Sequence, residues 1–340
     1  MTTPPEPRYE IVDPATLRQR LADHDWAEAP ATGGGSPLTV VDLTGADAAT
    51  LGGTPSATIP RVFVTIGGEG THARGTLDVA LDDDDDGYMA LREIAATCTT
   101  APRAASVVAQ LLRTADTGTM AQGLWRESVA YSMLLAGPEF AAWRRRRRKK
   151  ASDAPATERD FPLAVDDRGD VVDVILDRPH VHNAYNAAMR DALCAVLRQF
   201  LKAADPPIVH LRGNGPSFCS GGDLDEFGTT PDVVLAHGIR TNRAPGVLLD
   251  AFGSLSTASV HGSCIGAGTE LPAFCARVEA AADAQFRLPE VAMGLVPGAG
   301  GTVSVTRRIG RQRTALLALT GRTIDAHTAL EWGLIDAVVP

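Results

Sequence analysis

The sequence predicts an α/β protein with a helical segment in its N-terminal half, and two patterns carry this prediction. From residue 161 onward, short apolar strands alternate with glycine-rich loops and helices, as in α/β cores whose loops present backbone amides at helix N-termini. Over residues 88–148, side chains such as Leu124, Ser128 and Tyr131 recur at helical spacing. The 340 residues suffice for one large or two modest domains.

The composition excludes several classes of partner. Hydrophobic residues make up 44% of the chain and charged residues 21%, as in ordinary globular proteins. The formal net charge of -9 gives no general attraction to nucleic acid or to anionic lipid. No apolar run approaches the ~18 residues of a membrane span, and the N-terminus lacks a secretory signal. We therefore expect neither a nucleic-acid nor a membrane partner.

The cysteines and the missing motifs narrow the chemistry. The five cysteines are scattered and never spaced C-x-x-C, which favours free thiols in a reducing cytoplasm over a zinc ribbon. The usual motifs of dinucleotide-binding proteins, P-loop proteins, zincins and α/β-hydrolases are absent. A zinc ribbon and these four classes of protein therefore lose their usual support in the sequence.

The N-terminal elements follow in order. Residues 1–35, rich in Pro, Gly and Ala, suggest a flexible leader, and residues 151–162 suggest a polar linker. The aspartate run at 82–86 predicts a solvated loop, because like charges repel and resist burial together. Pro102 and Pro138 stand where new helices can begin. Three short apolar stretches predict strands, at 38–43, 61–66 and 76–81.

The C-terminal half has clearer signals. Residues 171–176 and 208–211 predict strands. Between them, Asn186 can cap a helix whose apolar positions form one face. Two glycine-rich loops, at 213–223 and 262–268, each lead from a strand toward a helix.

Five segments of this half, in the same order, resemble the crotonase (enoyl-CoA hydratase/isomerase) superfamily. They are residues 176–184 (LDRPHVHNA), 218–224 (FCSGGDL), 261–270 (HGSCIGAGTE), 286–302 (FRLPEVAMGLVPGAGGT) and 333–340 (GLIDAVVP). The resemblance implies a catalytic core over 163–340, built as a spiral of ββα units. It further implies an acyl-CoA thioester substrate, with coenzyme A as the carrier and no metal or redox cofactor. It also implies a homotrimer or dimer of trimers.

The resemblance assigns the oxyanion hole to the backbone amides of Gly222 and Ala267. Two preorganised N–H donors stabilise negative charge on a thioester oxygen, and losing one typically costs on the order of 10²–10³ in rate. Glycine-rich loops let the backbone approach a ligand closely. The alternative is that each loop is only a tight strand-to-helix turn.

Glu270 and Glu290 fall where hydratases of the family carry catalytic glutamates. Hydration of a conjugated enoyl thioester needs a water at Cβ and a proton at Cα, work that two carboxyl groups can share. Alternatively, Glu270 is a first-turn glutamate favoured by the helix dipole, and Glu290 is an exposed loop carboxylate. Pro272 departs from the family pattern and could redirect Glu270.

The same motifs imply further contacts with substrate and CoA, and leave some residues structural. We expect Cys219 to be a small buried residue, His261 to be structural and Asp223 to bind loop backbone. The basic run 144–150 is either a solvated helix end or a contact to CoA phosphates. The substrate or CoA contacts implied are Arg178, Val181, Asn183, Ala184, Ser220, Gly221, Asp223, Gly266 and Gly298.

Residues 36–150 resemble, in order, the strand and helices that close a crotonase chain. We interpret them as a shrunken first copy whose helices cover the second copy, which stops at Pro340. Residues 88–148 should then pack against the core and make subunit contacts, so the oligomerisation helices come from the N-terminal region. The alternative is an unrelated helical extension.

The leading hypothesis is an enoyl-CoA hydratase of fatty-acid-type metabolism. Three alternatives stay open. The first is an enoyl-CoA isomerase, which would tolerate loss of Glu270. The second is a cofactor-independent acyl-CoA dioxygenase-like member, in which we would expect a non-acidic residue at position 270, and the third is a non-catalytic acyl-CoA-binding protein.

Overall fold

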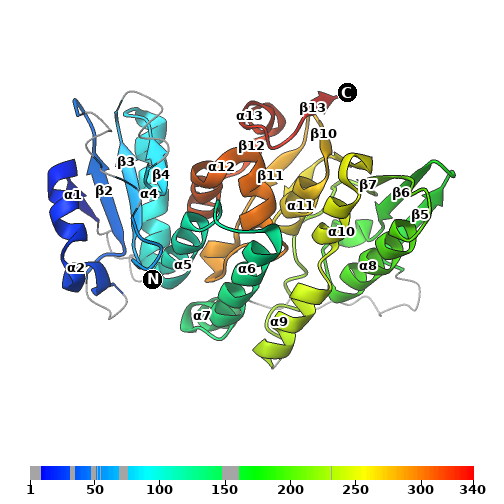
Figure 1. The fold of residues 1–340 in the computed structure, drawn as a ribbon, viewed down its shortest axis with the longest axis horizontal. Helices are drawn as coiled ribbons and strands as arrows, with labels where there is room; N and C mark the ends of the chain where they lie inside the picture. Colours follow the sequence, from blue (N-terminus) through cyan, green and yellow to red (C-terminus); the bar gives the residue numbers. More distant parts are fainter. Residues whose placement is uncertain are drawn as a thin grey trace.

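The structure, a computed structural model, describes residues 9–30, 35–46, 51, 53, 55–68, 76–147, 161–230 and 232–340. Most of the predicted linker at 151–162, namely residues 151–160, lies outside the described residues. The described chain forms three sheets and the helices around them (Figure 1), which confirms the α/β class.

The N-terminal sheet contains four parallel strands in chain order: β1 (Glu10–Val12), β2 (Leu38–Asp42), β3 (Val62–Ile66) and β4 (Val79–Leu81). The three predicted strands are confirmed as β2, β3 and β4. Both faces of this sheet are covered, because Val40 and Val64 join the main core while Val41 and Phe63 join a second apolar cluster.

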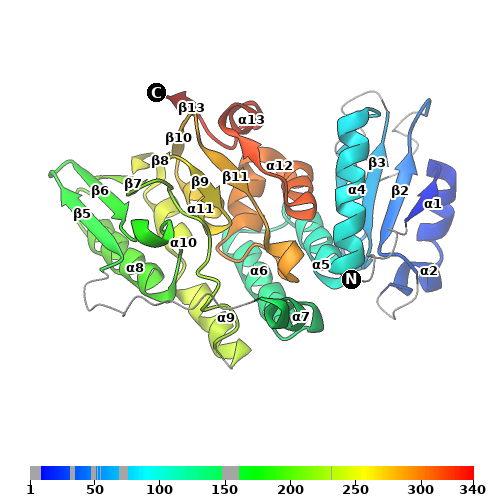
Figure 2. The same cartoon turned by 180° about the vertical axis from the view of Figure 1, so that it is seen from behind.

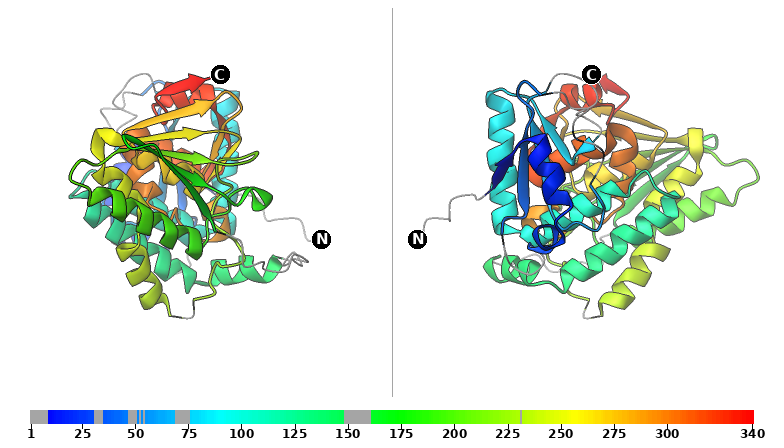
Figure 3. Two further views of the ribbon diagram at one scale, coloured as in Figure 1. Left: turned by 90° about the vertical axis from the view of Figure 1, so that its right-hand side faces the viewer. Right: turned by 60° about the vertical axis from the view of Figure 1, so that its left-hand side comes forward.

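The expectation of a flexible leader is wrong for residues 10–28. These form β1, α1 (Pro14–Leu21) and α2 (His24–Glu28), and α1 and α2 lie over the outer face of the sheet (Figures 1 and 3). Asp13 caps α1 through the amides of Ala15 and Thr16. Leu17 is fully buried in the second cluster, so burial overrides the Pro- and Gly-rich composition.

The predicted helical region is confirmed as α4 (Asp85–Thr100), α5 (Pro102–Arg113), α6 (Met120–Leu135) and α7 (Pro138–Arg146). Both prolines stand in the first helical turn, as expected. The aspartate run is not merely a loop. Asp84 caps α4 by accepting a hydrogen bond from the amide of Gly87, and two further aspartates occupy the first turn. Negative charge is favourable there because it faces the positive end of the helix dipole.

The central sheet has six strands in the order β13-β10-β8-β7-β6-β5. All its pairings are parallel except that of β5 with β6. Neighbouring strands of this sheet come in chain order, from β6 through β7, β8 and β10 to β13. The chain therefore advances by one strand with each turn of a spiral. The bounds are β5 (Leu163–Asp167), β6 (Val171–Leu176), β7 (Ile208–Gly213), β8 (Ser256–Val260), β10 (Arg277–Ala281) and β13 (Ala337–Val339).

A smaller sheet lies beside it, formed by β9 (Ser263–Ile265), β11 (Gln285–Arg287) and β12 (Ile324–Asp325). The predicted helix is α8 (Ala187–Leu201), capped by Asn186 through the amide of Met189. The other helices are α9 (Val233–Asn242), α10 (Pro245–Ala251), α11 (Ala267–Glu270), α12 (Gly301–Thr320), which breaks at Gly310, and α13 (Ala326–Trp332).

Helix α12 joins the two halves of the molecule. It packs against α4, α5 and α6 of the N-terminal half, and α6 also packs along α9. Figures 1 and 2 show α4 between the N-terminal sheet and α12. One apolar core runs through both halves. The prediction that residues 88–148 pack against the core is therefore confirmed, whereas their subunit contacts stay a prediction.

The ends of the two sheets share one hydrogen-bonding pattern. Asp336 donates its amide to the carbonyl of Val278 and accepts the Val278 amide with Oδ2 at 2.7 Å. Asp78 makes the same pair of bonds with Phe63, at 3.0 and 2.8 Å. Strands β3 and β4 thus correspond to β10 and β13. The hypothesis of a shrunken copy stays a prediction, but this shared geometry favours it.

Candidate active site

The two glycine-rich loops lie side by side because they pair as short parallel strands. The Phe218 amide donates to the carbonyl of His261 at 2.9 Å, and the Ile265 amide donates to that of Cys219 at 2.9 Å. This pairing directs the following residues, Gly222 and Ala267, to the wall of one cavity.

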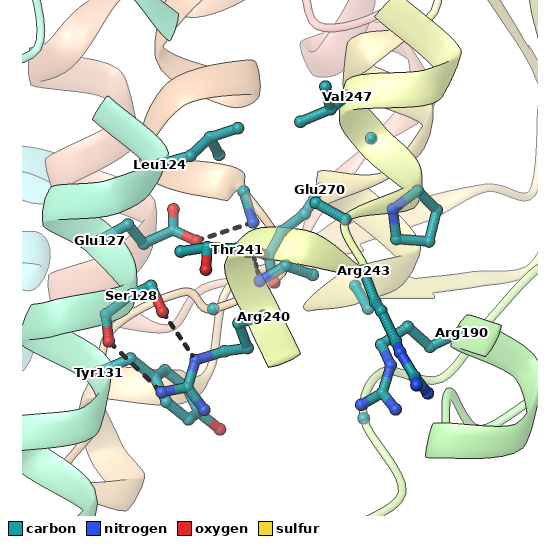
Figure 4. A pocket seen from close by; sticks show the side chains of 18 of the residues that line it. Leu124, Glu127, Ser128, Tyr131, Arg190, Arg240, Thr241, Arg243, Val247 and Glu270 are labelled. Atoms are coloured by element: carbon teal, nitrogen blue, oxygen red, sulfur yellow. Dashed lines mark hydrogen bonds between the residues drawn. The ribbon is translucent and has the colours of Figure 1, made fainter. Parts of the chain in front are cut away.

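The cavity has a volume of about 430 Å³ and lies between the two halves of the molecule (Figure 4). Helix α6 forms one wall, and α9 and α10 form another. Apolar side chains cover much of its surface, including Leu124, Phe227 and Phe274. A concave, mostly apolar site with a few polar groups is typical of a small-molecule pocket.

Glycine is required at two points of these loops. A Cβ on Gly222 would lie 2.4 Å from the ring of Phe227, so a side chain there would displace the cavity wall. At Gly266, φ is +51°, and a Cβ would lie 2.4 Å from Oε1 of Glu290. Gly266 therefore lets the second loop pass directly against a predicted catalytic carboxyl.

The amides of Gly222 and Ala267 donate no hydrogen bond to any group in the described part of the chain. Both residues line the cavity, so these donors are available to a bound molecule. A turn-only role leaves two such donors without a function. Their convergence on one thioester oxygen stays a prediction.

Glu270 ends the short helix α11 and is 2% exposed. Its Oε2 accepts the amides of Ala299 and Gly301, at 2.8 and 2.7 Å. Burial raises the pKa of this carboxyl to about 7, although the backbone donors oppose the shift. Glu270 is thus not a simple first-turn glutamate, because its carboxylate binds the start of another helix. Pro272 begins a separate 3-10 turn and leaves this orientation intact.

Glu290 begins the 3-10 turn η5 (Glu290–Met293) and is 7% exposed, so the alternative of an exposed loop carboxylate is wrong. Its buried Oε2 has no hydrogen-bond partner among the described residues. Burial, and then the nearby charge of Glu270, raise the pKa of Glu290 well above its usual value. A buried, unpaired carboxyl oxygen at a cavity wall is a group for a ligand to bind.

A third carboxyl, Glu127 of α6, was not among the predicted site residues. Its Oε1 accepts the Gly300 amide at 2.8 Å, and its Oε2 accepts the amide and hydroxyl of Thr302 at 3.0 and 2.6 Å. Burial and the charge of Glu270 raise its pKa to about 8. Figure 4 shows Glu127 and Glu270 reaching the same region from different helices. The available signal was that Glu127 is the sole acidic residue of α6.

The start of α12 is therefore held by two carboxyl groups. Four successive amides, from Ala299 to Thr302, donate alternately to Glu270 and Glu127. The partial positive charge of a helix N-terminus favours acidic partners at this point. The N-terminal half thus contributes directly to the geometry of Glu270.

The predicted substrate and CoA contacts divide into two groups. Gly298 lines the cavity, together with the four residues assigned to acid–base work and the oxyanion hole. Among the described residues that line the cavity, the other eight are absent. They lie in or next to the two glycine-rich loops. They are Arg178, Val181, Asn183, Ala184, Ser220, Gly221, Asp223 and Gly266.

Asn183 is a correction, because it is 0% exposed and cannot touch CoA. Its Oδ1 accepts the amide of Arg178 at 2.7 Å, and its Nδ2 donates to two carbonyls of the 214–217 turn. Arg178 pairs with Asp223 at 3.4 Å and donates to the carbonyl of Ala184. These residues hold the first loop in place.

Cys219 and His261 have the structural roles expected of them. Cys219 is buried, and burial raises the pKa of its thiol to about 12, so it is no nucleophile. His261 Nε2 bonds to the carbonyl of Gly215 at 2.8 Å. In the basic run, Arg144 donates to the carbonyl of Gly228 and Arg147 to that of Leu224, so both bind the loop after Gly222. Residues 148–150 lie outside the described residues, and contact with CoA phosphates stays a prediction.

A family model described as enoyl-CoA hydratase/isomerase matches residues 166–340, somewhat more than half of the chain. The chain belongs to this family. The match confirms the predicted crotonase fold, and it begins near the predicted start of the core.

Two curated relatives of this family are similar over the same half. A mevalonyl-coenzyme A hydratase of Beauveria bassiana is 35% identical over 178 residues, which are 50% of this chain and 64% of the relative. A 2,3-dehydroadipyl-CoA hydratase of Escherichia coli is 33% identical over 165 residues, 48% of this chain and 64% of the relative. The chain thus spans slightly less than two thirds of each. A solved enoyl-CoA hydratase of Bacillus anthracis is 33% identical and aligns with a TM-score of 0.48, covering 53% of this chain and 70% of that one.

Proposed function

We propose that this family member is an enoyl-CoA hydratase, which adds water across the conjugated double bond of a 2-enoyl-CoA thioester. The observation that carries the proposal is a pair of buried glutamates with different protonation tendencies beside two unpaired loop amides on one cavity. The names of the two curated hydratases agree with it.

In the proposed reaction, the thioester oxygen accepts hydrogen bonds from the amides of Gly222 and Ala267. As the oxygen of water bonds to Cβ, the double-bond electrons move toward the thioester and form an enolate, which these donors stabilise. The water gives one proton to Glu270, and the enolate takes one proton at Cα from Glu290. The net change is addition of one water molecule.

The assignment of the two roles follows from their surroundings. With a pKa of about 7, Glu270 is substantially ionised at neutral pH and can act as a base. The pKa of Glu290 is raised well above its usual value, and no donor in the described part of the chain bonds its Oε2, so it keeps its proton and can act as the acid. After one turnover Glu270 holds a proton and Glu290 lacks one, so transfer of that proton from Glu270 to Glu290 restores the starting state.

We favour the hydratase over an isomerase because Glu270 is buried, oriented by two amides and placed on the cavity. An isomerase moves one proton along the chain and can use a single carboxyl. We expect Glu270→Gln and Glu290→Gln each to lower the turnover of crotonyl-CoA hydration by ~10²–10⁴. Loss of enoyl absorbance in the ultraviolet measures the rate.

Glu331→Gln on the exposed face of α13 serves as the control and should keep the parent rate. Binding of a saturated acyl-CoA, measured by calorimetry, should stay nearly unchanged in the two active-site variants. If both variants hydrate crotonyl-CoA at the parent rate, the acid–base assignment is wrong. If only Glu270→Gln is tolerated, and it isomerises a 3-enoyl-CoA, the protein is an isomerase.

The proposed setting is a cytoplasmic homo-oligomer, a trimer or dimer of trimers. All five cysteines are free and buried, as suits a reducing compartment. In the described residues, no helix is long and apolar enough to cross a membrane. The same residues contain no group of Asp, Glu, Cys or His side chains that could hold a metal ion.

The proposed subunit contacts have support on α6 and α9, where four large apolar side chains are exposed: Trp125, Met133, Val234 and Leu235. Light scattering of the purified protein tests the oligomeric state.

A further inference from the structure

Three arginines line the same cavity as the glutamates: Arg190, Arg240 and Arg243 (Figure 4). The proposed hydration of an enoyl thioester needs none of them. A guanidinium group in the wall of a mostly apolar pocket requires an explanation, because burying a charge is costly unless it is paired.

Two of these arginines share one aspartate as their ion-pair partner. Arg190 Nε donates to Oδ1 of Asp191 at 2.9 Å, and Arg243 Nη1 donates to Oδ2 at 2.6 Å. The third, Arg240, forms no salt bridge with any described carboxylate. The carboxyl group that raises the pKa of Arg240 is that of Glu127, and both of its oxygens already accept hydrogen bonds from the start of α12.

The neutral partners of Arg240 hold it in one orientation. Nε donates to the hydroxyl of Ser128 at 3.2 Å, and Nη2 donates to the Ser128 carbonyl and the Ser132 hydroxyl. The guanidinium carbon lies 4.7 Å from the centre of the Tyr131 ring. Nη1 donates to no group in the described part of the chain. The group is thus both fixed and incompletely satisfied.

Burial lowers the pKa of Arg240, as expected for a cation that water solvates poorly. An anion entering the cavity would relieve this cost. A carboxylate suits the position, because the guanidinium fork binds carboxylates through charge-assisted hydrogen bonds. Apolar side chains such as Leu124, Phe227 and Phe274 elsewhere in the wall suit the methylene groups of an acyl chain.

We propose that the acyl chain of the substrate ends in a carboxylate, and that Arg240 is the residue that recognises it. The substrate class is then a 2-enoyl-CoA derived from a dicarboxylic acid. This inference rests on the proposed function for the thioester end of the substrate, and it adds a specificity subsite at the other end.

The test compares thioesters of equal chain length that end in methyl or in carboxylate: 2-hexenoyl-CoA with 2-hexenedioyl-CoA, and 2-octenoyl-CoA with 2-octenedioyl-CoA. Because a hydrogen bond to a charged group contributes about 1.5–3 kcal/mol, we expect kcat/KM to favour the carboxylate member of at least one pair by about 10- to 100-fold. Arg240→Met should abolish this ratio, and Arg240→Lys should restore part of it.

Two further variants separate recognition from a structural role of Arg240. Ser132→Ala removes one tether but keeps the guanidinium, so the ratio should persist. Arg243→Met removes an arginine that already has an ion-pair partner in Asp191, and should change the ratio much less than Arg240→Met. A ratio that Ser132→Ala and Arg240→Met abolish alike would show that Arg240 only joins α6 to α9, and would overturn the proposal.

Binding of the saturated analogues octanoyl-CoA and octanedioyl-CoA, measured by calorimetry, tests the subsite without turnover. Tighter binding of octanedioyl-CoA, lost in Arg240→Met, supports the subsite even if no enoyl-CoA is hydrated, in which case the proposed function fails alone. If both members of each pair are hydrated with equal kcat/KM, the carboxylate subsite is wrong, whereas the proposed hydratase function is supported. A preference for a hydroxyl-ended chain over the carboxylate also overturns it.

Discussion

At the scale of single residues, the site depends on how burial changes the protonation of its carboxyl groups. Water stabilises an ionised carboxyl, and the protein interior around Glu270, Glu290 and Glu127 removes most of that water. Burial is the largest cause of the raised pKa in all three. Three acids can therefore share a small region without full mutual repulsion, because they are not all ionised at neutral pH.

The proposed roles predict a bell-shaped dependence of hydratase kcat/KM on pH. Activity should rise as Glu270 loses its proton, with an apparent pKa of about 7, because only the carboxylate can accept a proton from water. It should fall at higher pH, as Glu290 loses the proton that it donates. Steady-state rates on crotonyl-CoA between about pH 5 and pH 10 measure both limbs. A flat profile across about pH 6–8 would contradict the assignment of Glu270 as the base.

At the scale of elements, the start of α12 connects α6 of the N-terminal half to the carboxyl group of Glu270 in the active site. Its amides orient Glu270, and Glu127 of α6 holds the intervening amides from the other side. A helix terminus buried without such acceptors would leave its amides unsatisfied. The position of α6 therefore affects the orientation of the Glu270 carboxyl group.

We expect Glu127→Gln to lower the free energy of unfolding by about 1–3 kcal/mol, because the glutamine NH₂ would face amide donors in place of an acceptor. Hydratase turnover should fall as well, since the α12 start also orients Glu270. Urea unfolding and crotonyl-CoA kinetics measure the two effects. Glu331→Gln, on an exposed side chain, is the matched control. Parent-like stability together with parent-like turnover would show that this contact is dispensable.

The N-terminal sheet depends on a buried ion pair between Asp78 and Arg113, each of whose side chains is 1% exposed. Breaking a buried pair leaves one charge uncompensated, which typically costs about 3–5 kcal/mol. We expect Asp78→Asn to lower the free energy of unfolding by about that amount, measured by urea denaturation.

Asp336 supplies the comparison, because it makes the same backbone bonds but pairs with Arg308 at a more exposed place. Asp336→Asn should cost less than Asp78→Asn, because solvent can compensate the remaining arginine. An equal or larger cost for Asp336→Asn would mean that the backbone bonds, rather than the ion pair, dominate.

At the scale of the whole molecule, the N-terminal half completes the site as well as the fold. Helices α4, α5 and α6 cover α12, and α6 forms a wall of the cavity. Without them, a large apolar surface and the two amides that donate to Glu127 would be exposed to water.

We therefore expect residues 151–340 expressed alone to be insoluble or misassembled, and residues 36–150 supplied as a separate chain to rescue them. Solubility, light scattering and hydratase activity measure the outcome. The intact protein is the control. A soluble, active 151–340 fragment with the assembly state of the intact protein would show that the N-terminal half is an independent appendage.

The sequence alone was enough to place most elements and both loops, because these depend on local chemistry. Asn186 caps α8, the prolines begin α5 and α7, and the glycines allow the tight turns before Gly222 and Ala267. The positions of Glu270 and Glu290 also came from sequence, through their motifs. The helix α9 and the fold of residues 10–28 were not predicted, because their stability comes from packing rather than from local pattern.

Only the tertiary structure decided what surrounds these residues. The hydrogen bond from Gly300 to Glu127 joins residues 173 positions apart, and Arg240 meets Ser128 from a separate helix 112 positions away. No spacing in the sequence predicts such contacts, since they depend on how α6 passes between α12 and α9. The pKa of each glutamate depends on the same contacts, because desolvation and neighbouring charges come from segments distant in the chain. The residues able to do the chemistry were therefore visible in the sequence, whereas their protonation and the arginine that lines the same cavity were decided by the fold.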